Sequence, residues 1–267
     1  MRELHLFAGA GGGILGGMLL GHLPVCAVEI DAYCRKVLAA RQADGWLPGF
    51  PIYEDVRQFD GRPWRGRVDV VAGGFPCQPW STAGKRKGTD DPRHLWPEMA
   101  RIVEEVRPKY VFAENVSLAA LEEPWRDLRG LGYRVAPAIC VAASDVGAPH
   151  LRKRWWLLAA DADGGRRQER AQRDLKPSAG QQAPQRDDAL RLCVADTSSA
   201  RLEVGQGPKG QRAHAAATGA GWWQAEPDVG RVANGVAHRV DRLRALGNGQ
   251  VPMAAATAWR YLMQQLD

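Results

Sequence analysis

The fold is decided by one stretch of the sequence, Val68-Asp69-Val70-Val71-Ala72-Gly73-Gly74-Phe75-Pro76-Cys77-Gln78-Pro79. Its first five residues are mostly β-branched and apolar, which predicts a buried strand that the two glycines end. Two prolines then flank Cys77 and restrict the backbone around it. A cysteine at the carboxyl end of a strand in an open α/β sheet lies where such folds bind ligands, and its thiolate is a strong nucleophile. The alternative is a proline-rich turn around a buried cysteine.

The chain has 267 residues, enough for one sizeable core and a small second lobe. Its 45% hydrophobic and 25% charged residues are ordinary for a soluble globular protein. No apolar run has the length of a membrane span, and the chain opens directly into a predicted strand, so we expect neither membrane insertion nor a signal peptide. The scattered, unpaired cysteines favour a cytoplasmic, reducing setting without disulfides or a bound metal. They are Cys26, Cys34, Cys77, Cys140 and Cys193.

The net charge of +6 suits a polyanionic partner. Arginine accounts for 29 of the 36 basic residues, and its planar fork suits phosphate and guanine. A genome rich in G and C is the alternative cause, because it inflates Arg, Ala and Gly together.

A glycine-rich turn near the amino terminus predicts a cofactor site. Residues 4–7 form a predicted strand, Ala8–Gly13 a turn, and Ile14–Leu20 a helix weakened by its glycines. A helix start after such a turn offers free N–H groups and allows a ligand to approach closely. A second strand ends at Glu29, whose carboxylate could bind ribose hydroxyls, although an exposed strand-end acid is common. A helix is predicted over residues 31–40.

Two further strand ends carry acids. Tyr53–Val56 closes a third predicted strand, and Asp55 is either an adenine-binding residue or a turn aspartate. After a predicted helix over His94–Val106 comes the buried strand Tyr110–Val116, which ends in Glu114 and Asn115. In the same sheet as Cys77, Glu114 is a candidate general acid or base, or else a helix-start cap.

The polar, basic stretch Thr82–Pro92 predicts a loop that either closes on a phosphate backbone or is simply solvated. Two strands are predicted at 132–135 and 138–143. Arg152 and Arg154 then alternate along an incipient strand, so we expect both on one face, where they suit an anionic or carbonyl-rich ligand. A solvated strand edge is the alternative.

Composition changes after Ala160. Residues 161–224 are rich in Gln, Arg, Asp, Gly and Ala, which predicts an insertion with a role of its own, partly disordered. Asn234 to Leu246 is predicted to be a loop that enters a helix, followed by a Gly247-Asn248-Gly249 turn and a final helix over Met253–Leu266. The expected domains are 1–160, 161–224 and the returning segment 225–267.

In this order, these blocks resemble the DNA (cytosine-5-)-methyltransferases of prokaryotic or phage type. The resemblance covers nearly the whole chain except 161–224. Its most specific part is Pro-Cys-Gln followed by Glu-Asn-Val at this spacing. His150 departs from the family, which usually has Gln two residues before the first Arg. The matching residues are Phe7-Ala8-Gly9-Ala10-Gly11-Gly12, Glu29, Asp55, Pro76-Cys77-Gln78, Glu114-Asn115-Val116, Arg152-x-Arg154 and Gly247-Asn248-x-x-Val251-Pro252.

The resemblance implies a Rossmann-like, S-adenosylmethionine-dependent methyltransferase fold, with a mostly parallel sheet, helices on both faces and a small inserted lobe. The last helix would pack beside the first, and 161–224 would recognise the target sequence. The implied reaction is sequence-specific methyl transfer to carbon 5 of cytosine in double-stranded DNA, with S-adenosylhomocysteine as the product. It would proceed through a covalent cysteine adduct on a flipped-out base.

The resemblance also assigns roles. Cys77 would attack ring carbon 6, Glu114 would hydrogen-bond or protonate ring nitrogen 3, and Arg154, with Arg152 beside it, would hold the base carbonyl. Cofactor contacts would come from Phe7, Ala8, Gly9, Gly11, Gly12, Glu29, Ile30, Asp55, Val56, Pro76 and Asn248. DNA contacts would come from Gln78, Ser81, Lys85, Arg86 and Lys87. We expect a monomer without metal or membrane contact, in a bacterial or phage-infected cell, with a cognate restriction endonuclease as a further partner in a restriction-modification system.

Three alternatives stay open. A tRNA cytosine-5 methyltransferase shares the catalytic blocks, but its recognition lobe carries a Cys-Phe-Thr stretch that this sequence lacks. A nicotinamide dehydrogenase would fit Gly11-x-Gly13-x-x-Gly16 yet leaves Pro76-Cys77-Gln78 and Glu114-Asn115-Val116 unexplained. A non-catalytic DNA-binding relative would need a defect that the sequence does not reveal.

Overall fold

Eight strands form one sheet in the computed structural model, which describes residues 1–76, 94–162 and 238–266. The sheet order is β3-β2-β1-β4-β5-β8-β6, and β7 also pairs with β8. The first five strands in this order run parallel, and β8 runs antiparallel to β5, β6 and β7. The strands are β1 (Arg2–Leu6), β2 (Leu23–Val28), β3 (Ile52–Tyr53), β4 (Val70–Gly74), β5 (Tyr110–Asn115), β6 (Tyr133–Val135), β7 (Ile139–Ala142) and β8 (Lys153–Asp161).

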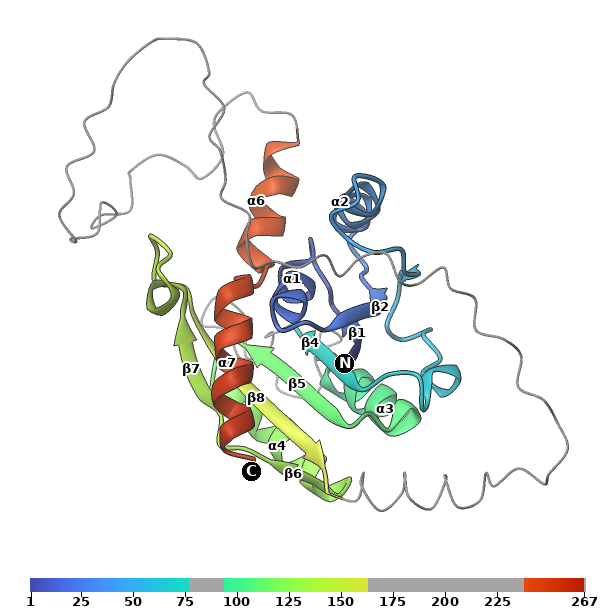
Figure 1. Cartoon of the computed structure of the whole chain (residues 1–267), viewed down its shortest axis with the longest axis vertical. Coiled ribbons are helices and arrows are strands. Elements are labelled where there is room, and N and C mark those ends of the chain that lie inside the picture. Colours follow the sequence, from blue (N-terminus) through green and yellow to red (C-terminus); the bar gives the residue numbers. More distant parts are fainter. Residues whose placement is uncertain (77–93, 163–237, 267) are drawn as a thin grey trace, which may run out of the picture. The chain divides into compact units, whose positions relative to one another are not determined.

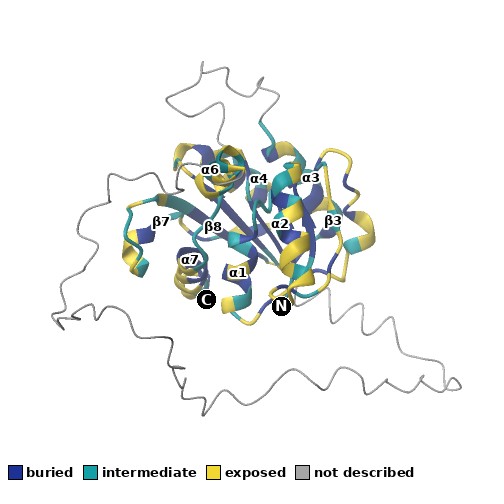
Figure 2. Cartoon of the chain, turned by 90° about the horizontal axis from the view of Figure 1, so that it is seen from above, coloured by how far each residue is buried: buried dark blue, intermediate teal, exposed yellow. Residues whose placement is uncertain are grey.

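Helices cover both faces of the sheet (Figures 1 and 2). Helices α3 and α4 lie on one face, whereas α1 and α7 lie side by side on the other. The close approach of α1 and α7 depends on Gly16, where an added Cβ would lie 2.8 Å from the Cβ of Ala255. The helices are α1 (Gly12–Leu19), α2 (Ala32–Ala43), α3 (Trp96–Val106), α4 (Glu122–Gly130), α6 (Arg239–Asn248) and α7 (Pro252–Gln264), with short 3-10 turns at Arg62–Trp64, Ala119–Leu121 and Ala143–Val146.

The core follows from apolar patterning. Helix α3 buries Trp96, Met99, Ile102, Val103 and Val106 along one stripe. Strand β8 is apolar on both faces because it is central: one side joins the cluster under α7 and the other joins the cluster under α3 and α4. The predicted mostly parallel sheet, and the final helix beside the first, are confirmed.

Three local predictions were wrong. Strand β3 ends at Tyr53 because the Asp55 carboxylate accepts a hydrogen bond from the Arg57 backbone N–H, which forms a turn. Strand β4 begins at Val70 and keeps both glycines inside its ladder, where they pair with β1 and β5. Helix α6 continues through Gly247 and Asn248 rather than ending at Leu246, and a Gly249 N–H···O=C Ala245 bond closes its last turn.

The strand order sets the position of the site. From β1 the chain crosses to β2 on one side, whereas β4 pairs with β1 on the other side. Such a reversal leaves a crevice at the carboxyl ends of the two central strands. The glycine-rich turn follows β1, and the segment leading to Cys77 follows β4, so both begin at this crevice.

Candidate functional site

A cavity of about 730 Å³ opens at the carboxyl ends of the parallel strands. Its size falls within the range of small-molecule sites. Its walls combine apolar groups with carboxylates, and it reaches from β2 across β4 and β5 to β8 and the end of α6. It is lined by Phe7, Gly9, Val28, Glu29, Ile30, Asp31, Cys34, Glu54, Asp55, Val56, Arg57, Gly74, Phe75, Pro76, Leu95, Glu114, Asn115, Val116, Arg154, Arg244, Ala245, Gly247 and Asn248.

The glycine-rich turn is shaped by left-handed backbone and by one buried acid. Phe7 has a φ of 54° and Gly11 a φ of 96°, the second at the N-cap of α1, where glycine avoids strain. Glu29 accepts hydrogen bonds from the backbone N–H groups of Gly9, at 2.6 Å, and Asp31, at 2.8 Å. Glu29 therefore ties the turn to the end of β2, and it also lines the cavity.

Most residues that the sequence predicted for the cofactor meet at this cavity. Phe7, Gly9, Glu29, Ile30, Asp55, Val56, Pro76 and Asn248 line it, whereas Ala8, Gly11 and Gly12 do not. The Ile30 side chain is 62% exposed. Asp55 pairs with Arg57 at 2.9 Å, which lowers the pKa of the Asp55 carboxyl.

Glu114 lines the cavity at the carboxyl end of β5. Burial raises the pKa of its carboxyl, and this outweighs the opposing effects of a Gln250 hydrogen bond and the nearby arginines. Its Oε1 lies 3.0 Å from Arg154 Nε, and its Oε2 accepts a hydrogen bond from Gln250 Nε2 at 3.1 Å. A buried carboxyl with a raised pKa keeps its proton to higher pH than an exposed one, which suits a general acid.

The segment that leads to Cys77 is fixed beside Glu114. Gly74 is the register partner of Glu114 between β4 and β5. The Asn115 side-chain amide donates to the Phe75 carbonyl at 3.2 Å, which anchors the chain where it leaves β4. Cys77 itself lies just outside the described residues, next to Pro76.

The two arginines have different surroundings. Arg154 belongs to β8 and pairs with Glu114. Arg152 precedes the strand with a φ of 33°, so the expected alternation of the two side chains along one strand is wrong. Its guanidinium donates to the backbone carbonyls of Gly247, at 2.8 Å, and Gly249. Arg152 therefore holds the last turn of α6 and the residue that follows it.

A family model for C-5 cytosine-specific DNA methylases matches residues 1–206. The chain belongs to this family. It is 38% identical over 169 residues to the type II methyltransferase M.Eco47II of Escherichia coli, covering 60% of this chain and 39% of that one. It is 37% identical over 165 residues to M.NgoMIV of Neisseria gonorrhoeae, covering 59% of this chain and 51% of the relative. The chain thus spans about half, or less, of the length of these relatives.

A solved structure agrees with the fold. It is a prophage-encoded protein from E. coli, assigned as a DNA modification methyltransferase, with 28% identity and a TM-score of 0.50 over 60% of this chain and 47% of that chain. The methylase fold is thereby confirmed, and membership of the family sets aside the nicotinamide dehydrogenase.

The three cysteines that the structure describes in this methylase-family chain are poor nucleophile candidates. Burial raises the pKa of Cys26 to about 12, and burial together with Glu29 and Asp31 raises that of Cys34 to about 12. Such thiols stay protonated and inert. Cys140 is exposed and lies outside the cavity lining. Within residues 1–76, 94–162 and 238–266, no group of three acidic, histidine or cysteine side chains could hold a metal.

Sequence reasoning missed several residues of the cavity. Asp31, Cys34 and Arg244 line the cavity, and Gln250 reaches Glu114 from a segment 136 residues away. Asp31 carried a detectable signal, since it precedes a helical stretch and caps α2 through the Tyr33 and Cys34 N–H groups. Nothing in the local sequence signalled Gln250. The DNA contacts Gln78, Ser81, Lys85, Arg86 and Lys87 lie outside the described residues.

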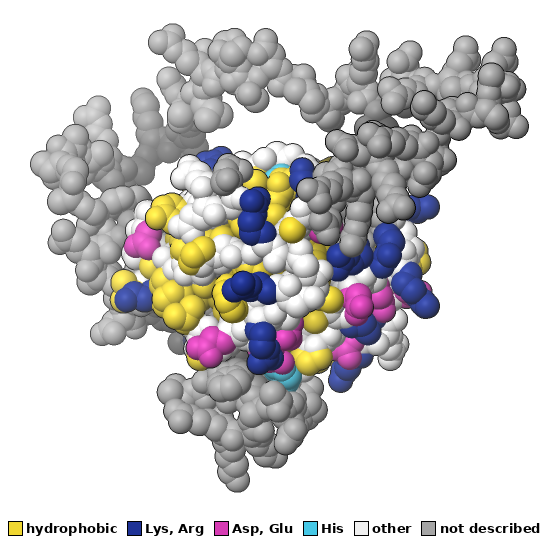
Figure 3. Space-filling view, turned by 90° about the horizontal axis from the view of Figure 1, so that it is seen from below, with side chains coloured by type: hydrophobic (Ala, Val, Ile, Leu, Met, Phe, Trp, Pro, Cys, Tyr) yellow, Lys and Arg dark blue, Asp and Glu magenta, His cyan; other side chains and the backbone are white. Residues whose placement is uncertain are grey.

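Charges of both signs share the surface of the methylase domain. The face seen from below mixes basic and acidic side chains (Figure 3). Several arginines pair with a neighbouring acid, as Arg62 does with Asp60 and Arg126 with Asp127. In the part of the chain that the structure describes, no helix is long and apolar enough to cross a membrane.

Proposed function

We propose that this protein transfers a methyl group from S-adenosylmethionine to carbon 5 of cytosine in double-stranded DNA. The observation that carries the proposal is Glu114, a buried carboxyl with a raised pKa, in register with the strand that leads to Cys77. Family membership supports the same reaction.

The cavity fits S-adenosylmethionine. Glu29 and Asp31 offer carboxylates to a cationic ligand that also carries ribose hydroxyls, and Phe7 and Ile30 offer apolar surface to its adenine. When bound, S-adenosylmethionine supplies an electrophilic methyl group and is converted to S-adenosylhomocysteine.

The residues of the chain prepare the cytosine ring. In the proposed sequence, the Cys77 thiolate forms a bond to ring carbon 6, and the ring electrons shift toward carbon 5. Glu114 donates a proton or hydrogen bond to ring nitrogen 3, so that negative charge does not build up on the ring. After carbon 5 is methylated, its proton passes to water, the bond to Cys77 breaks, and the ring double bond returns. The base must leave the helix stack to be reached, at a cost of roughly a few kcal/mol.

The arginines take separate roles in this proposal. Arg154 steadies the Glu114 carboxyl and contacts the base carbonyl, whereas Arg152 supports the wall formed by residues 247–249. Residues 161–224 would form the target-recognition lobe, and the loop 82–93 would close over the DNA. A protein in which 161–224 is replaced by the corresponding residues of a relative should methylate a different sequence. We further propose that the protein acts as a cytoplasmic monomer, beside a cognate restriction endonuclease.

The first test is Cys77→Ala in the full-length protein. Tritium transfer from methyl-labelled S-adenosylmethionine to unmethylated DNA should fall to background, because no other described thiol is placed to attack. Calorimetric affinity for S-adenosylhomocysteine should stay within about twofold, since the cavity walls are retained.

Cys140→Ala, at the exposed cysteine, is the matched control and should keep wild-type transfer. Turnover by Cys77→Ala equal to wild type would contradict the mechanism. Transfer to bulk tRNA without transfer to DNA would favour the RNA methyltransferase instead.

A further inference from the structure

Gln250 joins the carboxyl-terminal segment to the proposed catalytic acid. Its Nε2 donates to Glu114 Oε2 at 3.1 Å, while Arg154 Nε lies 3.0 Å from Oε1. Each oxygen of the Glu114 carboxyl therefore has its own donor, one from β8 and one from the turn between α6 and α7. Two fixed donors define the plane of a carboxyl group, which one donor cannot do.

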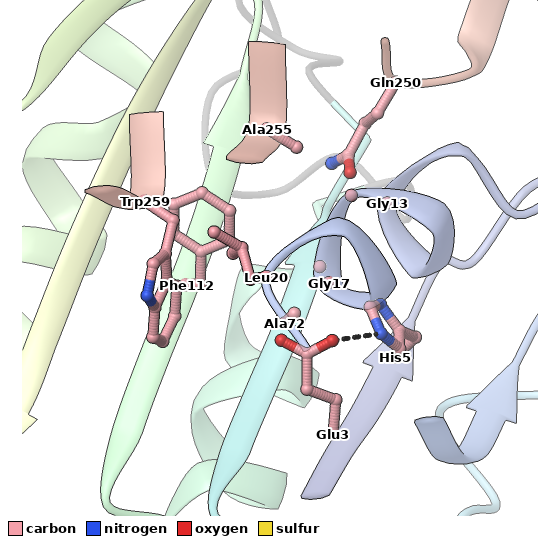
Figure 4. Close-up of a pocket in the computed structure, with 12 residues that line it drawn as sticks. Glu3, His5, Gly13, Gly17, Leu20, Ala72, Phe112, Gln250, Ala255 and Trp259 are labelled. Carbon is pink, nitrogen blue, oxygen red and sulfur yellow. Dashed lines mark hydrogen bonds and ion pairs between the residues drawn. The ribbon is translucent and has the colours of Figure 1, made fainter. Parts of the chain in front are cut away.

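The Gln250 side chain lies in a slot bordered by glycines. A Cβ added at Gly13, at the start of α1, would lie less than 3.0 Å from Gln250 Oε1. A Cβ added at Gly74, at the end of β4, would lie 2.9 Å from Gln250 Nε2. Figure 4 shows the amide of Gln250 directly beside Gly13. The amide therefore cannot swing to another rotamer on these sides without meeting backbone.

The backbone of Gln250 is held on both sides. Before it, Arg152 donates to the carbonyls of Gly247 and Gly249. After it, α7 begins at Pro252 and packs on α1 at Gly16. A Cβ at Gly12 would also meet the Gln250 carbonyl at less than 3.0 Å, so α1 and this turn touch through backbone. The donor to Glu114 is thus preorganised by the fold.

We propose that Gln250 is a positioning residue that orients the Glu114 carboxyl for the cytosine ring. This makes residues 247–252 part of the machinery that acts on the base, in addition to their place in the cavity wall. The inference rests on the proposed function.

The physical role of the contact is twofold. The amide donor stops rotation of the carboxyl about its Cγ–Cδ bond, so the oxygen facing the base is always the same one. It also opposes the effect of burial on the Glu114 pKa, because a donor stabilises the charged carboxylate. Removing the donor should therefore raise the Glu114 pKa and loosen its geometry together.

The direct test measures the Glu114 carboxyl itself. Carbon-13 carboxyl signals of the full-length protein are titrated in wild type and Gln250→Met, with Glu114→Gln assigning the signal. Methionine keeps the volume of the side chain but lacks the donor. The Glu114 pKa should rise by about one pH unit in Gln250→Met, because one hydrogen bond to a carboxylate is lost. Gln264→Met, at an exposed position on α7, should leave the pKa unchanged.

The kinetic test uses single turnover on unmethylated DNA. Gln250→Met should slow methyl transfer about tenfold, while the KM for S-adenosylmethionine changes less than about twofold. Combined with Glu114→Gln, it should slow transfer no further, because its effect passes through Glu114. Gln250→Asn, which keeps an amide but shortens its reach, should behave like Gln250→Met. If thermal melting shows that Gln250→Met does not fold, Gln250→Asn takes its place in both tests.

The outcomes separate this inference from the proposed function. An unmoved Glu114 pKa and a wild-type rate in Gln250→Met, with Glu114→Gln inactive, would overturn the role of Gln250 and leave the proposed function standing. Full activity of Glu114→Gln would overturn the proposed function, whereas a raised Glu114 pKa in Gln250→Met would still establish the contact.

Discussion

Two buried glutamates on the same face of the sheet behave in opposite ways. Glu3, near the amino end of β1, is 2% exposed, and Glu114, at the carboxyl end of β5, is 7% exposed. Burial raises the pKa of both carboxyls. At Glu3 it is outweighed by the His5 and His22 rings, which lower the pKa to about 2, whereas at Glu114 it prevails.

The partners explain the difference. The Glu3 oxygens lie 2.9 Å from His5 Nε2 and 2.7 Å from His22 Nδ1, and His22 packs edge-on against Trp259 at 5.0 Å. This cluster joins β1, the turn after α1, and α7. Figure 4 shows Glu3 and His5 of β1 and Trp259 of α7. Glu114 instead faces the 730 Å³ cavity with one arginine and one amide. Burial alone therefore does not distinguish the two carboxyls. The kind of groups that contact each carboxyl, and whether it lines a cavity, do distinguish them.

Glu114→Gln should show the largest effect. Loss of the acid should lower the rate of methyl transfer by roughly 10²–10⁴-fold, the usual contribution of a general acid or base. The melting temperature should change little, since glutamine keeps the side-chain shape. Single-turnover rates and thermal melts check both parts, and a wild-type rate would refute the role of Glu114.

Glu3→Gln should lower the stability of the protein and leave the rate of methyl transfer nearly unchanged. At pH 7 the free energy of unfolding should fall by about 3 kcal/mol, because two buried histidines lose their charged partner. The rate per folded molecule should stay within about threefold of wild type, because Glu3 does not line the cavity that holds Glu114. Urea denaturation measures the free energy of unfolding. A loss of transfer rate in Glu3→Gln as large as that in Glu114→Gln would contradict the different roles given to the two glutamates.

The stability from Glu3 should also depend on pH in a defined direction. The Glu3 carboxyl has a lowered pKa in the folded protein, so its contribution is complete above the ordinary value of 4.5 and disappears as the pH falls toward about 2. The stability difference between wild type and Glu3→Gln should shrink across this window. A difference that stays constant from pH 7 to pH 3 would show that the pair with the histidines is not its source.

Gly74→Ala should give the smallest effect. The Cβ of the new alanine would clash with the Glu114 carboxyl and lie 2.9 Å from Gln250 Nε2. It would therefore push the Glu114 carboxyl and the Gln250 amide apart. Transfer should slow about tenfold, with a stability loss of about 1–3 kcal/mol from overpacking. Gly49→Ala is the control, because no atom lies within 4 Å of its added Cβ. Equal rates in the two variants would mean that the Glu114–Gln250 contact does not matter.

Local patterns of the sequence predicted most of the architecture. The apolar runs in β4 and β5 and the apolar stripe of α3 each reflect burial within a single element. The meeting of Glu114 with Gln250 could not be predicted, because it depends on how α7 packs on α1 after a long excursion of the chain. The turn predicted at Gly247 is helical for a similar reason. The Gly249 N–H donates to the Ala245 carbonyl, and Arg152 donates to the Gly247 carbonyl.

The most direct measurement is bisulfite sequencing of the genome of a host that lacks cytosine methylation. The host would express either wild type or Cys77→Ala. The account predicts 5-methylcytosine in one short sequence motif with wild type and none with Cys77→Ala. Absence of 5-methylcytosine with wild type, or equal methylation with both proteins, would contradict the claim that this site methylates cytosine in DNA through Cys77.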